Sequence, residues 1–198
     1  MTRADRHDSI ATRLGALPAF PELRGPRVRL RGPRADDAAA VFALFSDPQV
    51  MRYWSRAPMT GIEEAHGLVA EILESFAQRT MLNWVVVDRD DHVTGTCTLF
   101  HFDPRHRRAE IGYALRSHLW GRGLAREAVA LALDWGFGKL GLHRVEADID
   151  PRNDGSRALL QRLGFNSEGL LRERFFVGEE PTDSEIFGLL AEEWRDLA

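Results

Sequence analysis

Cysteine, long apolar runs and an excess of positive charge are all scarce in this chain of 198 residues. The single cysteine, Cys97, excludes a disulfide within the chain and favours a reducing compartment. The longest apolar run, residues 38–45, is too short to cross a bilayer, and the polar N-terminus lacks the apolar stretch of a signal peptide. The formal net charge of −4 gives no general attraction to nucleic acid or to an anionic membrane. We therefore expect a cytoplasmic protein that binds neither.

Two common kinds of site also lack their sequence signals. The seven histidines have no close ligand spacing such as H-x-x-x-H, so we expect no metal site. A P-loop needs Gly-Lys followed by Ser or Thr, but the only Gly-Lys pair is followed by leucine (residues 138–140). The dinucleotide motif G-x-G-x-x-G fits Gly121 and Gly123, but Arg126 takes the third glycine position. A dinucleotide-binding dehydrogenase stays an alternative on this partial match.

The order of predicted elements favours one mixed α/β sheet. Residues 1–26 are polar with three prolines near their end, and we expect an N-terminal arm there and a domain over residues 27–198. Strands consecutive in the middle of the chain and alternating with helices later predict the mixed sheet. Strands are predicted at 27–31, 84–87, 93–102, 110–115, 143–148, 166–177 and 183–190. Helices are predicted from Asp36 or Asp37 to 46, at 61–79 with a Thr60–Glu63 capping box, from 124 to 140 before Gly141, and at 156–163, with a loop at 47–54.

The stretch HLWGRGLAREAVA, residues 118–130, places two glycines directly before a strong helix. A helix N-terminus has unpaired N–H groups and partial positive charge, and glycine lets a bulky anion approach the backbone. This arrangement suits a phosphate. A glycine turn that merely reverses the chain is the alternative.

The surrounding motifs resemble the RimJ/RimL-like branch of the GCN5-related N-acetyltransferases, the GNAT superfamily. The shared features, in order, are AEIGYAL, WGRGLAREAV, LGLHRVEADIDPRNDGSRALLQRLGF, EGLLRERFF and EEW, within a likeness over residues 27–195. Trp120 stands where the wider family often has Gln or Arg, but an aromatic residue is common there in this branch.

The resemblance implies a single domain with a central, largely antiparallel twisted sheet of about six to seven strands and about four helices. It also implies an enzyme that uses acetyl-CoA, without a metal, to acetylate a primary amine by direct attack. The acceptor would be a protein N-terminus or a small molecule. A non-catalytic acyl-CoA-binding sensor or scaffold is the alternative. Dimers are common in this branch, although these residues do not themselves indicate one.

The resemblance also assigns the acetyl-CoA site. Backbone N–H groups of residues 122–126 would hold the pyrophosphate, and the pantetheine arm would add to strand 110–115 where it splays from strand 143–148. An N–H near Ile111 or Gly112 would stabilise the oxyanion, and Gly112 is consistent with a bulge or close ligand approach. The assigned residues are Ile111, Gly112, Tyr113, Arg122, Gly123, Leu124, Ala125, Arg126, Asn153 and Ser156. Arg122 and Arg126 could instead be solvated, and Asn153 and Ser156 could merely cap a helix.

The catalytic and acceptor residues are less specific. Glu110 is the first candidate base, or a salt-bridge partner of a nearby arginine at 105, 107 or 108. Many relatives carry a tyrosine acid where Leu160 stands here, so Ser156 becomes the candidate acid. Tyr53 and Trp54 would line the acceptor site or simply pack. Glu168, Glu173 and Asp183 are further candidate bases or binders of a cationic acceptor, and Cys97 is expected in the core.

Overall fold

The computed structural model describes residues 9–197, so residues 1–8 of the expected arm lie outside the described part. The described residues form one mixed sheet of eight strands in the order β1-β2-β3-β4-β5-β6-β8-β7. The strands are β1 Leu23–Arg24, β2 Arg29–Arg31, β3 Leu82–Val87, β4 Val93–Asp103, β5 Arg108–Leu115, β6 Arg144–Ile149, β7 Asn166–Val177 and β8 Glu180–Leu190. The helices are α1 Ile10–Gly15, α2 Ala38–Phe45, α3 Pro48–Met51, α4 Ile62–Ala77, α5 Leu124–Trp135, α6 Asp154–Arg162 and α7 Ala191–Leu197. The predicted fold class is confirmed, with one strand more than expected.

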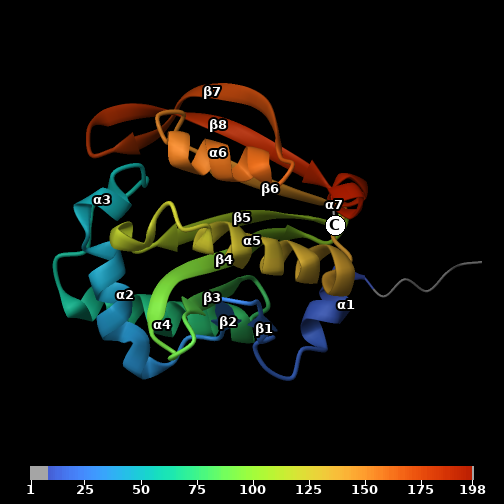
Figure 1. The fold of residues 1–198 in the computed structure, drawn as a ribbon, viewed down its shortest axis with the longest axis horizontal. Coiled ribbons are helices and arrows are strands. Elements are labelled where there is room, and N and C mark those ends of the chain that lie inside the picture. Colours follow the sequence, from blue (N-terminus) through green and yellow to red (C-terminus); the bar gives the residue numbers. More distant parts are fainter. Residues whose placement is uncertain (1–8, 198) are drawn as a thin grey trace, which may run out of the picture.

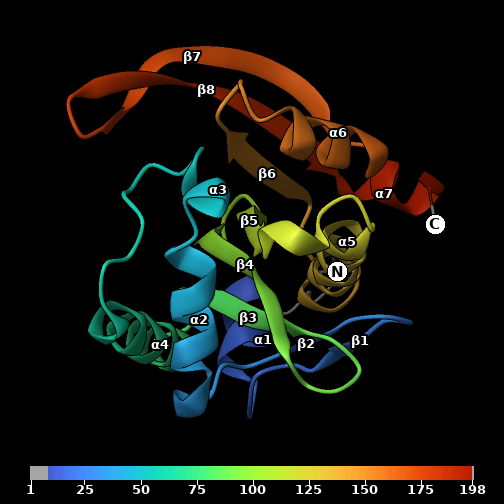
Figure 2. The same cartoon turned by 60° about the vertical axis from the view of Figure 1, so that its left-hand side comes forward.

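Helices cover both faces of the sheet, as Figure 2 shows for α2 and α4 on one side and α5 on the other. Because side chains alternate between the two faces of a strand, β5 contributes residues to the hydrophobic clusters on both faces of the sheet. Ile111 belongs to the larger core cluster with α1, α5 and α6, whereas Ala114 belongs to the cluster under α2, α3 and α4. Ile10 and Leu14 of α1 pack into the larger cluster. The division at residues 26 and 27 stays a proposal.

The β5–β6 pair is the feature that positions the site. It is the parallel pair of an otherwise antiparallel sheet, and its ladder runs only from Arg108–Arg144 to Glu110–Glu146. Beyond Glu110, among the described residues, β5 keeps its ladder to β4 but has no strand on its other edge. Figure 1 shows β6, β7, β8 and α6 above this line and the rest of the sheet below it. The expected splay between these two strands is confirmed.

Several local predictions were wrong by small shifts. The expected loop at 47–54 contains α3, because the Asp47 side chain accepts a hydrogen bond from the Gln49 N–H and caps a helix with Pro48 in its first turn. The capping carboxylate of α4 is Glu64 rather than Glu63, and its Oε1 accepts from the Thr60 and Gly61 N–H groups. The pattern also missed the short elements α1, β1 and α7.

Gly112 does not form a bulge. It pairs regularly with Thr98, and the irregularity in β4 lies between Phe100 and Asp103. A Cβ on Gly112 would meet only the Phe100 ring, at 3.5 Å. The bulge instead contains His101, whose φ of 49° is in the left-handed region.

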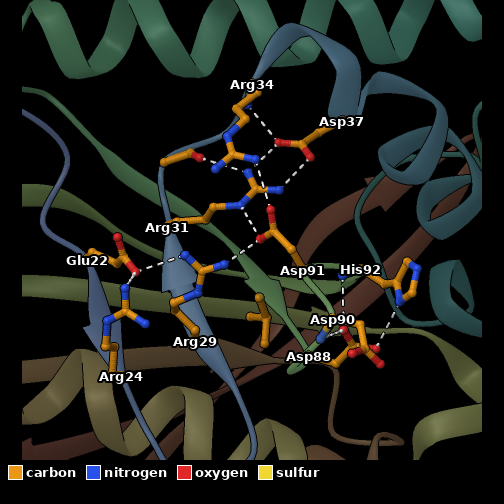
Figure 3. A network of polar contacts seen from close by, with 12 residues as sticks. Glu22, Arg24, Arg29, Arg31, Arg34, Asp37, Asp88, Asp90, Asp91 and His92 are labelled. Atoms are coloured by element: carbon orange, nitrogen blue, oxygen red, sulfur yellow. Dashed lines mark hydrogen bonds and ion pairs between the residues drawn. The ribbon is translucent and has the colours of Figure 1, made fainter.

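A buried ion-pair network ties β2 to the turn after β3 and to the start of α2 (Figure 3). The Arg31 guanidinium donates to both Asp37 carboxylate oxygens, at 2.7 and 2.9 Å, and its Nε donates to Asp91 at 2.9 Å. The side chains of Arg31 and Asp37 are 7% and 8% exposed. Asp91 also accepts from Arg29 and Arg34. The hydrogen bond from Arg31, helped by Arg34 and Arg29, holds the pKa of Asp91 below its usual range. Asp37 is therefore an ion-pair partner rather than the expected side-chain cap of α2.

In the same turn, Asp88, Asp90 and His92 bring their potential metal ligands within 4.8 Å of one another. Hydrogen bonds within the turn explain this proximity, because Asp88 Oδ1 accepts from the N–H groups of Asp90 and His92. No helix in residues 9–197 has the length and apolar character needed to span a membrane.

Candidate active site

The glycine-rich stretch forms a helix N-terminus that opens into a cavity. Gly121 and Gly123 have φ values of 75° and 74°, a conformation that costs other residues about 1–2 kcal/mol. Gly123 is the N-cap residue of α5. The first N–H groups of α5, next to Gly123, therefore have no carbonyl partner within the helix. Glycine is therefore needed at both positions for the positive φ, and it also lets a ligand approach the backbone closely.

Arg27, just before β2, fastens this loop from outside. Its guanidinium donates to the carbonyl oxygens of Arg122 at 2.7 Å and Gly123 at 3.3 Å. Its Nε and backbone N–H donate to Glu127 on α5, and the Val28 N–H joins them. Burial alone would raise the pKa of Glu127, but these donors outweigh it and hold the pKa below its ordinary value. The glycine-rich turn at residues 121–123 is thus held by residues about a hundred positions away.

The cavity has a volume of about 1030 Å³ and is strongly basic. Six arginines line it, against Asp154 as the one carboxylate among its described lining residues. The arginines are Arg27, Arg52, Arg122, Arg126, Arg152 and Arg162. Arg27 and Arg152 are themselves ion-paired with Glu127 and Asp150. Arg122 and Arg126 flank the N-terminus of α5, and this arrangement suits a ligand that carries phosphates.

Two hydroxyl groups meet on the wall of this cavity. Tyr113 Oη on β5 lies 2.6 Å from Ser156 Oγ on α6. Asn153 caps α6, because its Oδ1 accepts the Ser156 N–H at 3.0 Å. All three residues line the cavity, whereas Leu160 is fully buried in the core. The capping alternative for Asn153 is confirmed. Tyr113 was assigned to the acetyl-CoA site, but the contact of its hydroxyl with Ser156 was not predicted.

Glu110 lies on the opposite face of β5 from Tyr113, since strand alternation separates even from odd positions. Its Oε1 is 3.1 Å from His101 Nδ1, and the predicted arginine partner is wrong because Arg108 pairs with Glu146 at 2.7 Å. Glu110 is not part of the cavity lining.

A second carboxylate on this face, Asp148 of β6, was not predicted. Strand register places it two residues beyond Glu146, on the same face as Glu110. It accepts a hydrogen bond from Ser184 and lies 3.4 Å from the Arg174 guanidinium. Burial raises the pKa of Asp148 despite these two contacts. The spacing of two residues places Asp148 on the same face of the strand as Glu146, which could have been used to predict it. The sequence alone did not show that this part of β6 lies where the strand separates from β5.

The predicted acceptor residues separate into two groups. Tyr53 and Trp54 line the cavity, and Trp54 also packs edge-on against Phe45 with ring centroids 5.3 Å apart. Glu173 and Asp183 lie together on the β7–β8 hairpin, where the Glu173 N–H donates to Asp183 Oδ1 at 2.8 Å, and neither lines the cavity.

Two remaining candidates have structural partners. Glu168 is held by Arg144, whose hydrogen bond lowers the pKa of that carboxyl. Cys97 is fully buried, and burial raises the pKa of its thiol to about 12, which confirms its expected place in the core.

The fold and the cavity are those expected of an acyltransferase, and comparison with known proteins identifies the family. Residues 27–166 match the family model for the acetyltransferase (GNAT) domain. The chain belongs to this family and is an N-acetyltransferase, which confirms the resemblance seen in its sequence motifs.

Relatives and solved structures share most of the chain. An N-acetyltransferase of Bacillus licheniformis named p20 is 37% identical, over 85% of this chain and 95% of its own length. Spermidine N(1)-acetyltransferase of Escherichia coli is 31% identical, over 76% and 78%. Mycobacterium smegmatis RimJ, solved in complex with CoA-disulfide, superposes with a TM-score of 0.76 and 30% identity, over 87% of each chain.

Proposed function

We propose that this enzyme transfers the acetyl group of acetyl-CoA to a primary amine, which is either a protein N-terminus or a small molecule. The observation that carries the proposal is the basic cavity, where the N-terminus of α5 and six arginines adjoin the splayed edge of β5. The N–H groups at residues 122–126 would hold the pyrophosphate, and the free edge of β5 would bind the pantetheine. The relatives include an enzyme named for spermidine and a Bacillus subtilis protein named as a ribosomal N-acetyltransferase, which supports both acceptor types.

In the proposed reaction the amine nitrogen attacks the thioester carbon from the Glu110 side of the sheet. A C–N bond forms, the C–S bond breaks with its electron pair on sulfur, and the nitrogen loses a proton to the Glu110 carboxylate, which is the proposed base. N–H groups near Ile111 and Gly112 would stabilise the negative charge on the carbonyl oxygen. The aromatic residues Tyr53 and Trp54 would contact the acceptor. The proposal includes a cytoplasmic location, which the single cysteine supports.

Acetyl-CoA binding is testable by thermal melting. At about 100 times its dissociation constant a ligand adds about 2.7 kcal/mol, which for a chain of this size raises the melting temperature by roughly 5–10 °C. We expect this shift with acetyl-CoA and CoA but not with NAD. An amine panel of peptide N-termini and polyamines, followed by thiol release, then identifies the acceptor. A shift with NAD alone contradicts the proposal, and CoA binding without turnover on any amine favours a non-catalytic module.

Glu110→Gln tests the proposed base. General-base catalysis contributes about 10²–10⁴-fold, so we expect kcat/KM at pH 7 to fall at least tenfold. The deficit should shrink as the pH approaches the pKa of the acceptor amine, because more of the amine is then already neutral. Steady-state rates across pH measure both effects. His101→Ala is the matched control, since it removes the observed contact of Glu110 and keeps the carboxylate. Equal losses in both variants, constant across pH, would indicate a structural role.

A further inference from the structure

The close pair of hydroxyls in the cavity joins two elements that flank the splay. Tyr113 of β5 and Ser156 of α6 are 43 positions apart, and their oxygens are separated by 2.6 Å. Both side chains are held firmly at their bases. The Tyr113 ring packs against the larger core cluster, and the Ser156 N–H is fixed by the Asn153 side chain.

Chemistry decides which hydroxyl donates. A phenol is more acidic than an aliphatic alcohol and is the better hydrogen-bond donor. Burial raises the pKa of the Tyr113 phenol, so it keeps its proton throughout the accessible pH range. When the phenol donates to Ser156 Oγ, the single serine proton is free to point elsewhere. Because both residues line the cavity, the serine O–H can be directed into it.

We propose that Tyr113 is a positioning residue that orients the Ser156 hydroxyl so that its proton is donated to the sulfur of bound CoA. This inference rests on the proposed function. As the C–S bond breaks, the electron pair moves to sulfur, and the serine O–H stabilises the resulting thiolate by a hydrogen bond. Neither hydroxyl loses its proton. The proton released by the amine leaves on the Glu110 side, and the thiolate is protonated by water.

The Tyr113–Ser156 pair can replace the tyrosine acid that many relatives carry at position 160. Leu160 is fully buried in the core, and its side chain has no proton to donate. A thiol with a pKa near 8.5 is a fair leaving group, so an oriented hydrogen bond suffices and full proton transfer is not required. The pair therefore supplies from β5 and α6 jointly what a single tyrosine would supply.

The thiol pKa of bound CoA tests the inference directly. It is measured from the ultraviolet absorption of the thiolate in a pH titration of the CoA complex. We expect a thiol pKa below that of free CoA in the parent enzyme and a rise of about one unit in Tyr113→Phe and in Ser156→Ala. The double variant should match Ser156→Ala alone, because Tyr113 acts through the serine. Ser75→Ala on α4 is the matched serine control.

Kinetics give the second readout. Tyr113→Phe should lower kcat about tenfold, the worth of one hydrogen bond, with KM for acetyl-CoA within about twofold. Additive losses in the double variant, or an unchanged thiol pKa in both single variants, would overturn the inference while leaving the acetyltransferase activity standing. If the parent enzyme binds no CoA in the melting assay, the proposed function fails and the inference fails with it.

Discussion

Gly123→Glu is expected to abolish the stabilisation of this protein by acetyl-CoA. The added carboxylate would stand at the N-cap of α5, where the pyrophosphate is proposed to bind. Two like charges about 4 Å apart repel by about 4 kcal/mol at an effective dielectric constant of about 20, which weakens binding about a thousandfold. A Cβ at this position would also lie 3.5 Å from Nη2 of Arg27, so the new side chain would disturb the arginine that holds the turn. Melting curves with and without acetyl-CoA measure the loss.

Gly178→Glu is the matched control for that variant. Gly178 also has a positive φ, 64°, but lies at the tip of the β7–β8 hairpin, where a Cβ would point into open space. Both variants therefore introduce the same charge and similar backbone strain. We expect the control to keep the full acetyl-CoA shift. A Gly123→Glu protein that still melts higher with acetyl-CoA would place the pyrophosphate elsewhere.

Arg31→Met is expected to cause the largest loss of stability. The substitution leaves the Asp37 carboxylate buried without its guanidinium partner, and breaking such a pair costs about 3–5 kcal/mol. The Arg34 N–H still donates to Asp37, which places the expected cost near the lower end, about 3 kcal/mol. Urea unfolding at neutral pH measures the change as a lower midpoint at an unchanged slope.

The double variant Arg31→Met/Asp37→Leu separates pairing from burial. Removing both charges leaves no uncompensated ion, so this protein should be more stable than Arg31→Met alone. Arg24→Met is the control, because Arg24 pairs with Glu22 on the surface, where such changes cost less than about 0.5 kcal/mol. A single variant as stable as the parent would show that the network contributes no net stability.

Sequence reasoning succeeded where the information was local. The start of α5 directly after Gly123 was predicted from contiguous residues, and the structure confirms it. Strand alternation also sets the face of each β5 residue. The errors have equally local causes. Glu63 and Glu64 are adjacent, and either fits a capping box until the exact start of α4 is known.

Contacts between distant segments could not be predicted in the same way. Tyr113 meets Ser156 because β5 and β6 splay while α6 packs across them, and no periodicity encodes that crossing. The hydrogen bonds from Arg27 to the Arg122 carbonyl and to Glu127 link positions about a hundred residues apart. From residue types alone, the side chains of Tyr113, Ser156 and Arg27 could each pair with several other residues equally well. Asp148 was overlooked because the pattern shows its face but not its neighbours Ser184 and Arg174.

The three-residue ladder between β5 and β6 also sets when activity can arise during synthesis. Strands β1 to β5 each pair with their neighbour in the chain, so the ribosome delivers them in the order in which they assemble. The glycine-rich turn at residues 121–123 and α5 follow, but α6 supplies the other wall of the cavity. Strand β6 precedes α6 in the chain, and β8 must emerge before β6 gains its longer ladder. A nascent chain that ends before β8 is therefore an incomplete binder, and catalysis waits for almost the last residues to be translated.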